Sequence, residues 1–176
     1  IASNAEYLKQ MLKGKRIEQA VEQAINEEFL NNRDASTEDY TGNMVLVKNI
    51  VSKYIRQSII PYDIAHNDFA VMELEKRISN KFKLDDNREV MIGGYADRID
   101  SLGNGDIRVV DYKTGRSNLD ISGVSSLFEG EKCYEKGNLL QTMIYSMVLH
   151  NTLKRNVKPA LYYVRQMTSE DYNPHI

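Results

Sequence analysis

The chain has 176 residues, of which 41% are hydrophobic and 27% are charged, and its formal net charge is −2. These values predict one globular domain with its own core, and the slight negative charge argues against a free-standing protein that binds nucleic acid tightly, because that affinity depends on Lys and Arg. No apolar run approaches the roughly 20 residues needed to span a bilayer. The single cysteine, Cys133, excludes a disulfide framework and favours a reducing compartment, the cytoplasm.

The first part of the chain, about residues 1–62, is expected to be helical. In residues 15–31 apolar positions recur every three or four residues, which predicts an amphipathic helix. A second helix is expected to start near Ser36, to run to about Ser58 and to be ended by Pro61. Its expected buried residues are Met44, Val47, Ile50, Val51, Tyr54 and Ile55.

Strands are expected next, and a hairpin has the strongest pattern. Residues 69–74 and 77–84 have a mixed pattern that indicates strand only weakly. Two runs rich in β-branched residues, 90–102 and 106–113, flank Gly103-Asn104-Gly105. A glycine-rich loop between two such runs is typical of a hairpin turn.

The last third of the chain is predicted to hold a loop, a helix and a strand. Residues 116–137 are polar and rich in Gly and Ser, which predicts a long excursion from the fold. A helix is expected over residues 138–153, and a buried strand over residues 160–164 after a break at Pro159. The expected buried stripe of this helix is Leu140, Met143, Ile144, Met147 and Val148.

Charged side chains gather on one face of the expected hairpin. Asp111 and Lys113 are two residues apart on its second strand, so they share a face. A three-residue loop places Asp97 opposite Asp111 on that face, whereas a two-residue loop would turn Asp97 to the other face. Two carboxylates and one ammonium group form a minimal set for metal-assisted phosphodiester hydrolysis. The alternative is an ordinary Asp–Lys ion pair beside a surface carboxylate.

Three short motifs in this order resemble the PD-(D/E)XK nuclease superfamily, and within it the RecB/AddB-type exonuclease branch. They are Gly94 with Asp97-Arg98-Ile99-Asp100, then Asp111-Tyr112-Lys113-Thr114-Gly115, then Gln141 with Tyr145. The resemblance implies an α/β, restriction-endonuclease-like core over about residues 69–165, with a mixed central sheet flanked by helices. Together with the helical part it would form a single nuclease domain that belongs to a longer chain.

The resemblance also implies roles for the hairpin residues. Asp97, Asp111 and the backbone carbonyl of Tyr112 would bind Mg²⁺ or Mn²⁺, hard cations that prefer oxygen ligands. Lys113 would lie beside the attacking water and the scissile phosphate and would offset charge in the transition state. Water is the nucleophile in this scheme, so no Ser or Cys nucleophile is required.

Two helices would supply the remaining site residues. Gln141 and Tyr145 lie one helical turn apart and would position Lys113 or the DNA backbone, although both could equally be surface residues. Glu18 stands in the first helix where family members often carry a histidine, and it would be a further metal ligand. At the edge of the apolar stripe Glu18 could also simply extend to solvent, and Glu22 and Glu28 are rival acids on the same helix.

The expected function is a DNA nuclease of the exonuclease type, active in DNA repair or recombination beside a helicase domain in the same chain or complex. One alternative is a catalytically inactive, nuclease-like module that binds DNA ends or a partner protein. The negative net charge and the missing histidine in the first helix favour that alternative. Another alternative is hydrolysis of RNA or of nucleotides.

Overall fold

The computed structural model describes residues 4–66, 68–85, 87–115, 123–128, 136–169 and 171–176. They fall into two compact units, residues 1–67 and residues 68–176. None of the described helices is long and apolar enough to cross a membrane.

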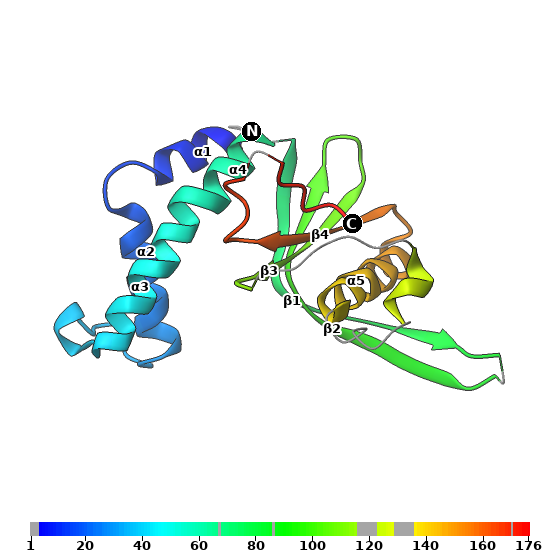
Figure 1. Ribbon diagram of the computed structural model, residues 1–176. Helices are drawn as coiled ribbons and strands as arrows, with labels where there is room; N and C mark the ends of the chain where they lie inside the picture. Colours follow the sequence, from blue (N-terminus) through cyan, green and yellow to red (C-terminus); the bar gives the residue numbers. More distant parts are fainter. Residues whose placement is uncertain (1–3, 67, 86, 116–122, 129–135, 170) are drawn as a thin grey trace. The chain divides into compact units, whose positions relative to one another are not determined.

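The N-terminal unit consists of helices around a small apolar core (Figure 1). Its helices are α1 (Asn4–Met11), α2 (Arg16–Glu28), α3 (Gly42–Tyr54) and α4 (Ile60–Ala65), with a 3-10 turn at Thr37–Asp39 and a π turn at Ile55–Ile59. The buried residues of its core are Ile17, Val21, Ile25 and Ile60. The predicted helix over residues 15–31 is confirmed, with the ends at Arg16 and Glu28.

The predicted limits of the second helix were wrong at both ends. Ser36 does cap a helical turn, but that turn is the short 3-10 helix, and the side chain of Thr41 accepts the hydrogen bond that starts α3. The helix also continues past Pro61, through the π turn and α4, to Ala65. Pro61 directly follows the π turn and lies in the first turn of α4, a position where proline is tolerated.

The predicted buried stripe of α3 was only partly right. Met44 and Ile55 pack against the core of the N-terminal unit. Val47, Ile50 and Val51 are instead 44%, 39% and 38% exposed. Apolar spacing identifies the face that can be buried, but a neighbouring element decides whether it is buried.

The C-terminal unit is built on a mixed four-stranded sheet with the strand order β1-β2-β3-β4. Neighbouring strands are antiparallel, except for the parallel pair of β3 and β4, and helix α5 (Gly137–Leu153) lies between these two in the sequence. The strands are β1 (Phe69–Lys83), β2 (Glu89–Leu102), β3 (Ile107–Lys113) and β4 (Val157–Tyr163). Helix α5 packs on one face of this sheet (Figure 1). The main core cluster at that face holds Ile78, Ala96, Ile99, Ile107, Val109, Tyr145, Val148 and Leu149.

The two weak strand segments form one continuous strand, β1. Its pairing with β2 shifts between Val71 and Glu73, and the ladder is interrupted again at Glu75, which has a φ of 46°. These irregularities break the alternation of apolar and polar residues and explain why the sequence pattern was weak there.

The β2–β3 hairpin has the three-residue loop that the site requires. Ile99 pairs with Val109, and the N–H of Leu102 donates to the carbonyl of Asp106 at 2.8 Å. Gly105 has a φ of 89°, which a glycine adopts without strain. The predicted register is therefore confirmed.

Helix α5 occupies the predicted residues, and its predicted stripe was partly right: Val148 is buried, and Leu140, Met143 and Ile144 pack against core clusters. Its buried residues are Leu139, Thr142, Tyr145, Ser146, Val148 and Leu149, whereas Met147 is 40% exposed. The prediction counted apolar residues only, while the helix packs partly through Tyr145 and small polar side chains. Of the predicted excursion, residues 123–128 include a 3-10 turn at Val124–Leu127, and residues 116–122 and 129–135 lie outside the described part of the chain.

The last strand begins earlier than predicted and contains Pro159. Within the sheet β4 pairs only with β3, so it is an edge strand, where proline is tolerated. The C-terminal residues lie along its other edge, where the N–H of Leu161 donates to the carbonyl of Pro174 at 2.9 Å.

Candidate active site

The two hairpin carboxylates meet at the end of β3. The register that pairs Ile99 with Val109 brings Asp97 of β2 to the level of Asp111, and Oδ2 of Asp97 accepts a hydrogen bond from the N–H of Tyr112 at 2.8 Å. Asp111 itself is only 2% exposed. The backbone of β3 thus orients Asp97, while the fold removes Asp111 from solvent.

Lys113 is held against Asp111. Its Nζ lies 2.6 Å from Oδ2 of Asp111, but the approach lacks the direction of a hydrogen bond, so the contact is an ion pair and this buried oxygen keeps its hydrogen-bonding capacity. Burial raises the pKa of the Asp111 carboxyl above its usual value, the Lys113 ammonium opposes this shift, and the charge of Asp97 adds to it.

Helix α5 provides the two polar residues that the third motif predicted. Oε1 of Gln141 accepts from Nζ of Lys113 at 3.4 Å, and Nε2 of Gln141 donates to Oη of Tyr145 at 2.9 Å. The hydroxyl of Tyr145 lies directly on strand β2 at Gly94, where an added Cβ would be only 2.5 Å from it. The glycine of the first motif therefore makes room for the tyrosine of the third.

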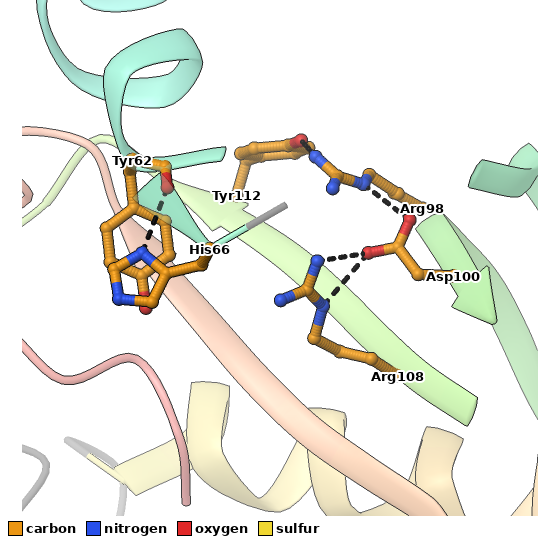
Figure 2. A network of polar contacts seen from close by, with 6 residues as sticks. All are labelled: Tyr62, His66, Arg98, Asp100, Arg108 and Tyr112. Carbon is orange, nitrogen blue, oxygen red and sulfur yellow. Dashed lines mark hydrogen bonds and ion pairs between the residues drawn. The ribbon is translucent and has the colours of Figure 1, made fainter. Parts of the chain in front are cut away.

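The other face of the hairpin holds a buried ionic cluster (Figure 2). Asp100 is completely buried and accepts from Arg98 at 2.7 Å and from Arg108 at 2.7 and 2.9 Å. Arg98 also donates to the hydroxyl of Tyr112 at 3.0 Å, and both guanidinium groups lie over the ring of Phe69. Arg98 and Asp100 of the first motif thus hold each other inside this cluster. Sequence reasoning missed Arg108, which the hairpin register places opposite Asp100.

Glu18 belongs to the N-terminal unit and is engaged there. Its carboxylate receives bonds of 2.7 to 3.1 Å from the guanidinium of Arg56, which also donates to the carbonyls of Leu12 and Gly14. The Arg56 hydrogen bonds hold the pKa of Glu18 below its usual value. The ionised form of Glu18 is thus stabilised, and its part in metal binding stays a prediction.

The residues at the hairpin fit a small divalent cation. In the described part of the chain no group of three or more His, Cys, Asp or Glu side chains could hold a metal. Mg²⁺, however, is commonly bound by one or two carboxylates together with water and substrate phosphate oxygens. Asp97 and Asp111 supply two such carboxylates, and among the described residues the buried Oδ2 of Asp111 has no hydrogen bond beside its ion pair with Lys113.

Comparison with known proteins places the chain in a family. One of the subunits of the ATP-dependent helicase/deoxyribonuclease of Streptococcus pyogenes serotype M49 (strain NZ131) is 33% identical over 64 residues, and its counterpart in serotype M6 (strain ATCC BAA-946 / MGAS10394) is 34% identical over 64 residues. The aligned stretch is 34% of this chain and 6% of each relative. The family model of the PD-(D/E)XK nuclease superfamily matches residues 5–174, across both units. The chain therefore belongs to the PD-(D/E)XK nuclease superfamily, and its mixed sheet packed against helix α5 has the restriction-endonuclease-like α/β fold of that family.

Proposed function

We propose that this protein is a divalent-metal-dependent deoxyribonuclease of the exonuclease type, which hydrolyses DNA phosphodiester bonds in repair or recombination. One observation supports it above all: Asp97, Asp111 and Lys113 come together at the end of one hairpin, in a chain of a nuclease family. A purely structural Asp–Lys pair would not require a second carboxylate, held by the backbone N–H next to the pair.

The metal ligands in this proposal are oxygen atoms. Asp97 and Asp111 would hold Mg²⁺ or Mn²⁺, with the backbone carbonyl of Tyr112 and the carboxylate of Glu18 as further ligands. When bound, the cation would supply Lewis-acid activation of water and of the phosphate. Glu18 would reach it only by exchanging its present bonds to Arg56.

Lys113 carries the electrostatic part of the proposal. The attacking water forms a new bond to phosphorus in line with the P–O bond that breaks, and negative charge accumulates on the phosphate oxygens. An ammonium group close to those oxygens stabilises this charge more than it stabilises the ground state. Gln141 accepts from Lys113 and donates to Tyr145, so this pair would restrict where the ammonium group lies.

The cellular setting is inferred from relatives. The similar proteins of Streptococcus pyogenes are named as subunits of a helicase/deoxyribonuclease. By analogy this nuclease would act on DNA beside a helicase domain, in the same chain or in a complex, within the cytoplasm.

The test compares variants on end-labelled single- and double-stranded DNA with Mg²⁺, Mn²⁺ or chelator. Asp111→Ala and Lys113→Ala should each reduce cleavage by a factor on the order of 10²–10³ or more, with an unchanged circular dichroism spectrum. Glu27→Ala and Arg33→Ala are matched controls, because they also remove one acidic and one basic side chain, from an ion pair in the N-terminal unit. Full cleavage by Asp111→Ala, or cleavage that persists in chelator, would refute the proposal.

A non-cleaving module that binds DNA ends or a partner protein is the second candidate. It is favoured by the engagement of both carboxylates, Asp97 by the Tyr112 N–H and Asp111 by Lys113. Calorimetric titration with Mn²⁺ separates the two candidates. Uptake that is lost in Asp97→Asn supports the nuclease, and the absence of uptake in the wild type supports the module.

A further inference from the structure

We propose that the exposed face of the β1–β2 hairpin arm binds a single strand of DNA. The arm is the part of β1 and β2 at residues 76–83 and 89–96, which extends away from α5 as a two-stranded ribbon (Figure 1). This inference rests on the proposed nuclease function and adds the surface that would hold the substrate.

The arm has two clearly different faces. Residues that pair across an antiparallel ladder point to the same face, and the pairs Ile78–Gly94 and Phe82–Val90 lie on the side that packs towards α5. The pairs one position before or after each of these point to the opposite face, and every residue in those pairs is exposed. This exposed arm face consists of Arg77–Tyr95, Ser79–Gly93, Lys81–Met91 and Lys83–Glu89.

The exposed arm face is basic in a chain that is slightly acidic. It carries three basic side chains, Arg77, Lys81 and Lys83, and one acidic side chain, Glu89. Arg77 and Lys83 form no ion pair within the described residues, and Lys81 makes only a loose one, 3.6 Å from Glu89, with both side chains largely in solvent. Because phosphate binding depends on local Lys and Arg, this cluster answers the objection that the net charge raises.

Two large side chains on the same face are left in solvent. Tyr95 is 59% exposed and Met91 is 62% exposed. Between them lies Gly93, where a Cβ would be 2.7 Å from the Cα of Ser79, so the middle of the arm face must stay flat. An exposed ring beside a flat backbone and flanking cations suits a stacked base with phosphates on both sides.

The dimensions favour a strand of several nucleotides. Arg77 and Lys83 are six residues apart, which at about 3.3 Å per residue is roughly 20 Å. Sites for single-stranded DNA commonly cover about 4–16 nucleotides and combine cations with aromatic side chains.

The experiment measures binding of a fluorescein-labelled single-stranded oligonucleotide by anisotropy, in chelator, over a range of salt concentrations. Arg77→Ala/Lys83→Ala should weaken binding and reduce the salt slope by about 1.4, since each phosphate contact on a single strand contributes about 0.7. Tyr95→Ala should weaken binding roughly fivefold or more without changing the slope.

Matched controls come from the N-terminal unit. Tyr7→Ala is the control for Tyr95→Ala, because Tyr7 is 63% exposed. Lys9→Ala/Lys13→Ala is the control for the double arm variant, because it removes the same charge. Both controls should bind like the wild type. Wild-type affinity and slope in the arm variants would overturn the proposal, as would a wild type that does not bind the oligonucleotide.

Failure of the surface and failure of the nuclease function give different results. If the arm variants bind and digest DNA like the wild type while Asp111→Ala is inactive, only the proposed binding surface is refuted. If the wild type cleaves no DNA but the arm variants lose binding, the binding surface is supported and the nuclease function is refuted. Hydrolysis of the small ester bis(p-nitrophenyl) phosphate by the arm variants should remain at the wild-type level, because this substrate does not reach the arm.

Discussion

At the scale of single residues, Gly94 and Tyr145 show how one missing side chain positions a polar group. The ring and hydroxyl of Tyr145 lie on the strand at Gly94, and the hydroxyl accepts from Gln141. A sequence motif that joins a glycine on a strand to a tyrosine on a helix about fifty residues later thus has a steric reason.

Gly94→Ala should therefore displace Tyr145 and disturb the Gln141–Lys113 contact. We expect a loss of about 1–3 kcal/mol in the free energy of unfolding. Cleavage should fall by a factor on the order of 10², as for small displacements of positioning groups. Urea unfolding and the DNA cleavage assay measure the two effects. Gly137→Ala is the control, because nothing lies within 4 Å of a Cβ at Gly137. Unchanged stability and cleavage in Gly94→Ala would contradict the claim that a side chain at Gly94 displaces Tyr145.

The buried ionic cluster belongs to the same scale. Asp100 has no exposure and faces two guanidinium groups, Arg98 and Arg108. Breaking a buried ion pair by neutralising one partner leaves charge in a medium of low polarity.

Asp100→Asn should reduce the free energy of unfolding by about 3–5 kcal/mol, measured by urea unfolding at neutral pH. Glu73→Gln is the comparison, because the Glu73–Lys76 pair is roughly half exposed on both sides and should change stability by no more than about 0.5 kcal/mol. Equal effects of the two substitutions would show that the cluster adds no more stability than a surface pair.

At the scale of elements, the turn between β2 and β3 sets the register on which the site depends. Asp106 accepts from Asn104 at 2.9 Å and lies 3.1 Å from Nζ of Lys158 on β4. These contacts, with the Lys158 bond first, hold the pKa of Asp106 below its usual value.

A lowered pKa of an acid predicts a definite dependence on pH. The charged Asp106 contributes stability above its unfolded-state pKa, and the contribution disappears as the pH falls through the folded-state pKa. The stability difference between the wild type and Asp106→Asn should therefore be largest near neutral pH and should disappear in acid. Urea unfolding of both proteins at several pH values measures it. A difference that grows on acidification would have the wrong sign.

At the scale of the whole molecule, a cation at the site would couple metal binding to stability. Asp97 accepts from the N–H of Tyr112 and Asp111 lies against Lys113, and we expect the chain to fold with these contacts before it binds a cation. Binding of a cation to the folded protein alone would then add stability according to its concentration.

Chelator should abolish cleavage and leave the circular dichroism spectrum unchanged. Mn²⁺ at about 100 times its dissociation constant should raise the free energy of unfolding by about 2.7 kcal/mol. Thermal unfolding with and without Mn²⁺ measures this effect, and Asp97→Asn/Asp111→Asn should remove it, whereas Asp106→Asn should retain it. An equal shift in the double variant would place the bound cation elsewhere.

Much of the C-terminal unit could be predicted because its signals are local. The register of the β2–β3 hairpin follows from its three-residue loop and from the alternation of strand residues, and it was confirmed by the pairing of Ile99 with Val109. Helix α5 was found from its apolar spacing. The predictions failed where an irregularity or a neighbour decides the outcome, as at the register shift between Val71 and Glu73 of β1 and at the exposed Val47 and Val51 of α3.

The sequence by itself determined the acidic hairpin, the order of the motifs and the family, because turn chemistry and side-chain alternation act over a few residues. Only the tertiary structure decided which oxygen of Asp111 faces Lys113, why Gly94 must lack a side chain, and that Arg108 completes the cluster around Asp100. These contacts join residues on different elements. They depend on which surfaces meet when the helix and the strands pack, and no local pattern in the chain records that.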